Sequence, residues 1–168
     1  MTIFGIHRNI SGRMLVLGSL FFLFACGEGK QKGSLFATKQ IVVDVVVFNY
    51  LNRPIYDVYL DGKMVGGSAS LSDSPYGQFS TIAGVVVPLG PQTLTWILDG
   101  PKGMFRNGEI DSVKNSLVIT PELVPPGVRS LGVHIYPDNT AELIFSKDVL
   151  EQSERGLVYA KEFQKHNE

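Results

Sequence analysis

The sequence predicts an all-β protein, an antiparallel β-sandwich of the immunoglobulin-like or a similar type, with a short C-terminal helix left open as an option. About seven or eight short stretches rich in β-branched and aromatic residues alternate with Gly- and Pro-rich turns. No convincing amphipathic helix precedes residue 146. With 44% hydrophobic and 18% charged residues, the composition is that of a folded chain.

Residues 41–50 are the most apolar of these stretches and are expected to form the central strand. Their β-branched and aromatic side chains occupy both alternating faces, as in a strand that is covered on both sides. A second strand, residues 56–60, turns at Asp61-Gly62 into a short partner at residues 63–65. Alternate apolar residues of the second strand are expected on one face: Tyr56, Val58 and Leu60.

Residues 66–77 are a cluster of Gly, Ser, Asp and Pro, polar enough and long enough for a functional loop. Strands are expected at residues 79–89 and 92–98, and Trp96 in the second is placed at the centre of the core. The later elements follow in order: a loop at 99–115, a strand at 116–120, a turn-rich connection at 121–127, and a hairpin of strands 131–136 and 140–145.

The sandwich domain is therefore expected to span residues 40–146. The tail, residues 147–168, has a weak helical pattern that either packs a short helix against the sandwich or trails away.

Residues 1–25 have the features of a signal peptide. The first 13 residues hold His7, Arg8 and Arg13 with no acid, and Met14–Ala25 is a run of 12 residues without a charge. Such a run is ~18 Å long as a helix, against ~30 Å for the hydrocarbon core of a bilayer. We therefore expect the apolar region of a signal peptide rather than a transmembrane anchor.

The motif that ends this segment resembles the lipobox of bacterial lipoproteins, and its residues are Leu23, Phe24, Ala25 and Cys26. The resemblance implies that Cys26 carries a thioether-linked acyl lipid and becomes the first residue of the mature protein. Cys26 is the only cysteine, so it has no partner for an internal disulfide. The alternatives are an ordinary signal peptide with an incidental cysteine, or an uncleaved anchor.

Residues 26–39 are largely polar and Gly-rich after the cysteine, as in a flexible tether. By analogy with lipoprotein sorting in Gram-negative cells, Gly27 in place of an aspartate favours the outer membrane. The expected location is the cell envelope, lipid-anchored and facing the periplasm.

Charge narrows the range of partners. Without residues 1–25 the chain has 13 basic and 16 acidic residues, a formal charge of −3. A nucleic-acid partner usually requires a basic face, and no polybasic segment is available to bind a membrane surface. Contact with the membrane is therefore expected through the lipid alone, with a protein as the partner in the envelope.

Catalytic groups are scarce, and we predict no enzyme, no catalytic residue, no metal site and no cofactor beyond the lipid. His134 is the only well-placed histidine, and its position within a strand favours a structural role. No Gly-x-Ser-x-Gly motif occurs, and too few His and Cys side chains remain for a zinc site. Three carboxylates lie in or near the 99–115 loop, Asp99, Glu109 and Asp111, and a glycan hydrolase using Asp99 or Glu109 is a weaker alternative.

A second group of oxygen ligands surrounds the last hairpin turn: Asp138, Asn139 and Glu142. Calcium binding would suit these side chains, although their spacing is not that of a recognised calcium loop. Turn formation explains Asp138 and Asn139 more simply.

The two long loops are the predicted binding surface, because loops on a rigid sheet commonly make protein contacts. Local packing of the loop aromatics is the alternative. The candidate binding residues are Ser70, Asp73 and Tyr76 in the first loop and Phe105 and Arg106 in the second.

Several segments carry a likeness to known proteins, namely Asn49 to Ile55, Val58 to Gly62 with Gly66-Gly67, Val87 to Gly90, Thr95 to Pro101, and Val133 to Asp138. Over about residues 40–146 the chain resembles a family of small uncharacterised proteobacterial lipoproteins, a domain of unknown function. Some of those proteins look like immunity proteins of type VI secretion lipase effectors. The resemblance implies a periplasm-facing domain that binds and blocks a toxin, and it transfers no inhibitory residue.

The sequence thus favours a non-enzymatic, membrane-anchored protein-binding module, with effector immunity as the more specific hypothesis. A structural or assembly lipoprotein of an envelope complex is the main alternative.

Overall fold

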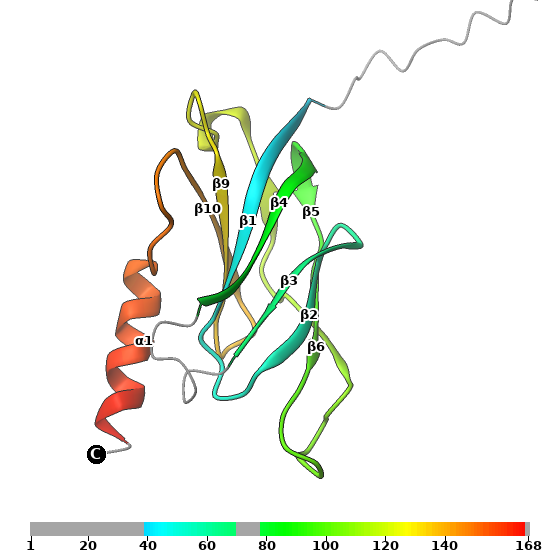
Figure 1. Cartoon of the computed structure of the whole chain (residues 1–168), viewed down its shortest axis with the longest axis vertical. Coiled ribbons are helices and arrows are strands. Elements are labelled where there is room, and N and C mark those ends of the chain that lie inside the picture. Colours follow the sequence, from blue (N-terminus) through cyan, green and yellow to red (C-terminus); the bar gives the residue numbers. More distant parts are fainter. Residues whose placement is uncertain (1–38, 70–77, 167–168) are drawn as a thin grey trace, which may run out of the picture. The chain divides into compact units, whose positions relative to one another are not determined.

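The long strand β1 (Gln40–Asn49) lies inside the first of two packed sheets in the computed structural model, which describes residues 39–69 and 78–166. This sheet, sheet A, has the order β10-β9-β1-β4. The second, sheet B, has the order β3-β2-β6-β7, and β5 pairs with β8 in a small two-stranded sheet. Figure 1 shows the two sheets, with the helix α1 beside sheet A. The all-β sandwich expected from the sequence is confirmed.

The bounds of the elements follow the sequence pattern closely. Sheet A also contains β4 (Gln78–Pro88), β9 (Ser130–Ile135) and β10 (Ala141–Ser146). Sheet B consists of β2 (Ile55–Leu60), β3 (Lys63–Ser68), β6 (Leu94–Leu98) and β7 (Ile110–Ser112). The remaining elements are β5 (Gly90–Gln92), β8 (Leu117–Ile119), the short 3₁₀ helix η1 (Pro121–Leu123) and α1 (Glu154–Lys165).

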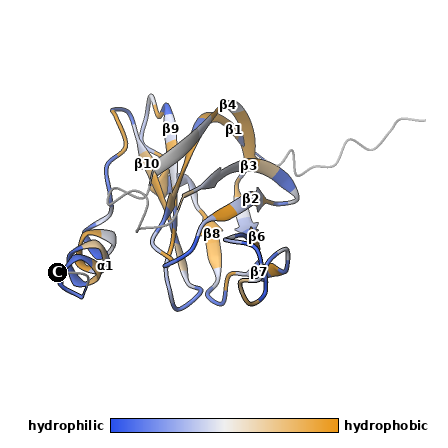
Figure 2. Cartoon of the chain, turned by 60° about the horizontal axis from the view of Figure 1, so that its bottom comes forward, coloured by the Kyte–Doolittle hydropathy of each residue, from blue (hydrophilic) through white to orange (hydrophobic). Residues whose placement is uncertain are grey.

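The core lies between the two sheets and is built from alternate residues of their strands. Val43, Val45 and Val47 of β1 face Trp96 and its neighbours, and Trp96 is fully buried as expected. Figure 2 shows how strongly apolar β1 and β8 are compared with the polar connecting segments. Burial of these branched and aromatic side chains is the main source of stability of the sandwich.

One pair of strands departs from the antiparallel pattern. β1 and β9 run parallel, with Asp44 opposite Ser130 and Asn49 opposite Ile135, whereas every other pairing recorded among the described strands is antiparallel. Sheet A is therefore mixed. Because β1 and β9 are parallel, the residues of the two strands on the outer face of sheet A follow each other in the same order.

The outer face of sheet A explains why β1 is apolar on both sides. Helix α1 covers part of it, and the residues buried in this second cluster come from the sheet, the α1 segment and the chain leading into it: Val46, Phe48, Tyr50, Tyr136, Leu150 and Ala160. The helix begins after Ser153, whose side chain accepts a hydrogen bond from the N–H of Gly156 and so caps the first turn. The tail thus packs as a helix.

Three details of the sequence reading are wrong. The expected alternation of Tyr56 with Val58 and Leu60 is broken, because the register shifts between Ile55 and Val58, and Tyr56 is exposed while the other two are buried. β3 continues through the expected start of the loop to Ser68. The 99–115 loop contains the short strand β7, which extends sheet B beyond β6.

Several predictions concern residues outside the described part of the chain. They are the signal peptide, the lipobox with Cys26, the tether, and the loop residues Ser70, Asp73 and Tyr76. All described residues belong to one compact unit. No helix within it is long and apolar enough to cross a membrane.

Candidate functional site

The loop between β6 and β7 projects past the ends of its strands (Figure 1). The side chain of Arg53 is hydrogen-bonded to the backbone of this loop. Nε and Nη2 of Arg53 donate to the carbonyl oxygen of Asp99 at 3.0 and 2.8 Å. Nη1 donates to the carbonyl of Phe105 at 2.9 Å, and Nη2 also reaches Oδ1 of Asn107 at 2.7 Å. A planar guanidinium can satisfy this divergent set of acceptors, whereas a lysine cannot.

Asn107 completes the frame of the loop from inside. Its amide nitrogen donates to the carbonyls of Gly100 and Pro101 at 3.0 and 2.9 Å. Gly100 has a φ of 155°, a backbone conformation that residues with a side chain rarely adopt, so glycine is favoured here. The loop is thus held at both ends by Arg53 and Asn107.

The side chain of Arg106 forms contacts within the protein. Its guanidinium forms ion pairs with Glu109 at 2.7 Å and Asp111 at 3.3 Å, and its backbone has a positive φ of 63°. The hydrogen bond from Arg106 to Glu109, with the nearby charge of Asp111, raises the pKa of the guanidinium. Oδ2 of Asp111 also accepts from the amide of Asn139 at 3.2 Å. The arginine braces the loop against β7 and the β9–β10 turn.

The side chain of Phe105 points to solvent from the loop that Arg53 and Asn107 hold in place. It is 83% exposed, although its carbonyl is held by Arg53. Ile110, the first residue of β7, is 69% exposed. Of the five candidate binding residues, Phe105 and Arg106 lie in the same described loop. The side chain of Phe105 is exposed, whereas that of Arg106 forms ion pairs that brace the loop.

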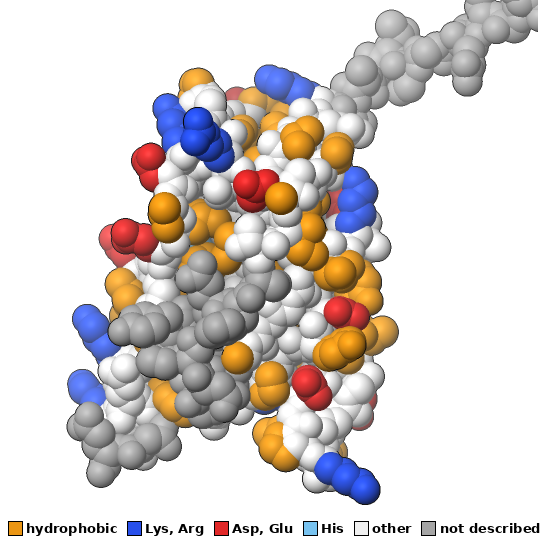
Figure 3. Space-filling view, in the orientation of Figure 1, with side chains coloured by type: hydrophobic (Ala, Val, Ile, Leu, Met, Phe, Trp, Pro, Cys, Tyr) orange, Lys and Arg blue, Asp and Glu red, His pale blue; other side chains and the backbone are white. Residues whose placement is uncertain are grey.

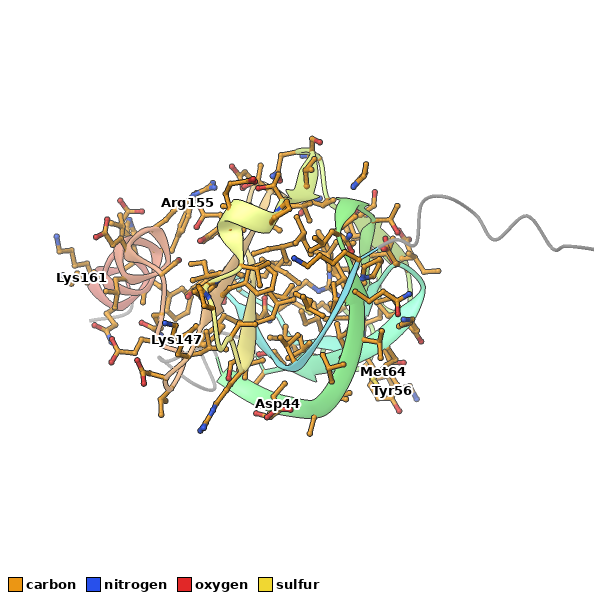
Figure 4. The ribbon with its side chains drawn as sticks, turned by 90° about the horizontal axis from the view of Figure 1, so that it is seen from above. Asp44, Tyr56, Met64, Lys147, Arg155 and Lys161 are labelled. Carbon is orange, nitrogen blue, oxygen red and sulfur yellow. The ribbon has the colours of Figure 1, made fainter. Side chains whose placement is uncertain are left out.

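The outer side of sheet B extends the exposed apolar surface. Tyr56 of β2 and Met64 of β3 are both exposed, and Figure 4 shows them on the side of the molecule away from α1. Figure 3 shows apolar side chains with acidic ones among them over the β2–β3 region. The sequence reading missed Tyr56 and Ile110, because strict alternation gives no sign of an irregular register or of an edge strand three residues long.

His134 lies far from solvent on the other sheet. Its ring is fully buried and stacks on Phe48 at a centroid distance of 4.4 Å, and its Nδ1 lies 3.0 Å from the Tyr50 hydroxyl. Burial lowers the pKa of His134 to about 4. These contacts fit the structural role expected from its position in the strand.

Of the carboxylates considered for chemistry, Glu109, Asp111 and Asp138 are engaged in local contacts. Glu109 and Asp111 both pair with Arg106. Asp138 accepts from the N–H and hydroxyl of Thr140 at 3.1 and 2.7 Å, and these bonds, with the nearby Arg155, lower the pKa of its carboxyl. Within residues 39–69 and 78–166 no group of three metal-ligating side chains comes together.

Comparison of the chain with protein-family models, curated proteins and solved structures gives no significant match. The resemblance to the proteobacterial lipoprotein family remains a prediction.

Proposed function

We propose that this protein is a lipid-anchored binding protein of the bacterial envelope, which captures a protein partner with the Phe105 loop. The single observation that supports this proposal is the exposed aromatic ring of Phe105 on a loop whose backbone is fixed by Arg53. Aromatic anchors dominate binding energy at interfaces, and a loop ordered in advance loses less conformational entropy on binding.

The surroundings of Phe105 suit a moderately large interface. Ile110, Tyr56 and Met64 add exposed apolar area on the same sheet, while Glu109 and Asp57 supply polar groups near it. An apolar centre with a polar rim is the usual anatomy of a specific interface. The proposed partner is therefore a folded protein with an apolar pocket for an aromatic ring.

The test places a photo-crosslinking amino acid at position 105 of the full chain in cells, with position 149 as the matched control. Val149 is 86% exposed and lies outside the proposed surface, on the segment after β10. A specific adduct at position 105 alone identifies the partner. With that partner purified, Phe105→Ala is expected to weaken binding about tenfold or more, whereas Val149→Ala leaves it unchanged. Equal affinity of both variants would reject the loop as the binding site.

The anchor needs its own experiment, because a binding loop does not require a membrane. Mass spectrometry of the membrane fraction is expected to find an acylated N-terminal peptide beginning at Cys26. A Cys26→Ala variant should carry no lipid and should no longer be found in the processed, membrane-bound form. Finding the variant with the same mass shift and location would overturn the anchor while leaving the Phe105 proposal standing.

The immunity role is the more specific form of this proposal and rests on the resemblance. It predicts that the partner is a secreted lipase and that the protein protects cells which encounter it. Loss of protection in a Phe105→Ala strain, with normal protein level, would support that role. An envelope protein recovered at position 105, without any toxin, would instead favour the assembly alternative.

A further inference from the structure

The outer edge of strand β10 has backbone groups without a partner among the described strands. β10 pairs with β9 in the register Glu142 opposite His134 and Ile144 opposite Gly132, and the N–H of Tyr136 donates to the carbonyl of Thr140. In an antiparallel pair, hydrogen-bonded positions alternate with positions that face away. The backbone groups of the even-numbered residues of β10 therefore bond to β9, whereas the N–H and carbonyl groups of Ala141, Leu143 and Phe145 point away from β9.

The backbone N–H and carbonyl of Ala141, the first of these residues, are hydrogen-bonded as they would be to a neighbouring strand. The side chain of Asn115 accepts from the N–H of Ala141 at 2.8 Å and donates to its carbonyl at 3.0 Å. The amide thus imitates one rung of a β-ladder. Beyond this rung, the N–H and carbonyl of Leu143 have no hydrogen-bond partner within the described ranges.

A groove of about 320 Å³ runs along this edge, between β10 and the segment that carries β8 and η1. β8 forms the facing wall with an edge of its own. Pro91, opposite Val118 in the β5–β8 pair, has no N–H to donate, so the backbone groups of Val118 point away from β5. Within the described residues, backbone groups of Leu143 and of Val118 therefore point toward the groove from its two walls.

The side chains of the groove suit an extended segment with alternate apolar residues. Val118, Leu123 and Ile144 line it and are exposed, with Leu123 at 53%. Glu142 is the only charged residue among the described lining residues, and one of its oxygens accepts from Tyr136. The negative charge of Glu142 favours a basic residue in the segment that binds.

We propose that this groove binds an extended peptide segment of a partner protein, which adds to sheet A as a strand at the edge of β10. The backbone N–H and carbonyl of Leu143 would bond to the segment, as those of Ala141 already bond to the side chain of Asn115. The apolar side chains of the groove would contact alternate residues of the segment, and Glu142 would pair with a basic residue in it. Strand addition of this kind takes affinity from the backbone and specificity from alternate side chains. The surface is separate from the Phe105 loop and does not depend on it.

The experiment selects displayed random peptides of about eight residues, a usual strand length, against the purified full-length chain in detergent. Selected peptides are expected to carry apolar residues at alternate positions and a basic residue. Leu123→Asp should weaken their binding about tenfold or more, whereas the matched exposed change Val149→Asp and the loop change Phe105→Ala should not. Binding should also slow hydrogen exchange at the amide of Leu143, because that amide gains an acceptor.

Three results would overturn the proposal: no peptide is enriched, the Leu123→Asp variant binds as well as the wild type, or exchange at Leu143 is unchanged in the complex. A fourth concerns self-association. If the chain alone forms a dimer in which the amide of Leu143 is already protected, the edge pairs with a second copy, and the partner peptide is rejected.

Discussion

The hydroxyl of Tyr50 lies 3.0 Å from Nδ1 of His134, where helix α1 meets sheet A. The backbone N–H of Ser153, the cap of that helix, donates to the same hydroxyl at 3.3 Å. Nε2, on the other edge of the His134 ring, has no hydrogen-bond partner among the described residues. One hydroxyl thus joins β9 to the start of α1.

The first prediction is that this junction makes stability depend on pH. The pKa of His134 falls from 6.5 to about 4 on burial, so between these values the unfolded chain binds the proton more readily than the folded one. The contribution of neutral His134 is complete above pH 6.5 and declines as the pH falls toward 4, by about 3 kcal/mol in all.

Urea unfolding across this pH window, for the wild type and His134→Phe, measures that contribution. Carboxylates titrate in both proteins, so the relevant quantity is the difference between the two curves of unfolding free energy against pH. The wild type should lose more stability on acidification than the variant. Parallel curves would show that His134 is not the titrating group.

The second prediction concerns Gly156, in the first turns of α1. A Cβ at this position would overlap the ring of Tyr50. In an exposed helix Gly→Ala usually stabilises by about 1 kcal/mol, but overpacking of a core costs about 1–3 kcal/mol, so Gly156→Ala should destabilise the protein. Chemical unfolding measures the sign, with Lys161→Ala as the exposed control in the same helix. A more stable Gly156→Ala protein would mean that α1 is not packed against Tyr50.

The packing of α1 shows how far sequence reasoning reaches. The alternation of Leu94, Trp96 and Leu98 predicts a buried strand face because it is local, and the structure confirms it. The stacking of Tyr50 on His134 and on Tyr136 is not local, because it depends on the parallel pairing of β1 with β9. No short-range pattern specifies which distant strands become neighbours.

The same limit applies to the candidate site. An aromatic residue in a Gly-rich loop is visible in the sequence, and this alone singles out Phe105. Arg53 is separated from Phe105 by 52 positions, so its hydrogen bonds to the loop could not be read from spacing. The sequence therefore predicts a loop with an aromatic tip, and only the fold reveals that the loop is rigid.

The third prediction tests that rigidity. Arg53→Lys keeps the charge but cannot bind the carbonyls of Asp99 and Phe105 together with Asn107, so the loop should open more often. Hydrogen exchange at amides of the loop that are bonded within it, such as Met104 to Pro101, should become about tenfold faster while the core strands stay protected. Arg129→Lys, at an exposed residue away from this loop, is the matched control. Unchanged exchange in the Arg53→Lys loop would show that other contacts hold it.

The last prediction separates two roles of Ser153. Its Oγ accepts from the N–H of Gly156 at 3.0 Å and lies 2.6 Å from the hydroxyl of Tyr136. Since that hydroxyl donates to Glu142 at 2.7 Å, the Ser153 hydrogen must go to Tyr136. Ser153→Ala removes both the cap and this donor, and should cost about 2 kcal/mol.

Ser153→Asp distinguishes the cap from the buried bond. An aspartate accepts from the first turn of a helix as well as serine does, and its charge suits the helix N-terminus, but an ionised carboxylate has no hydrogen to donate to Tyr136. If the cap alone matters, Ser153→Asp should unfold at the same urea concentration as the wild type. If the buried network carries part of the stability, Ser153→Asp should remain destabilised, and more so at neutral pH, where its charge lies near that of Glu142. We expect the second result, because Ser153 is buried and the pKa of Tyr136 is raised chiefly by burial.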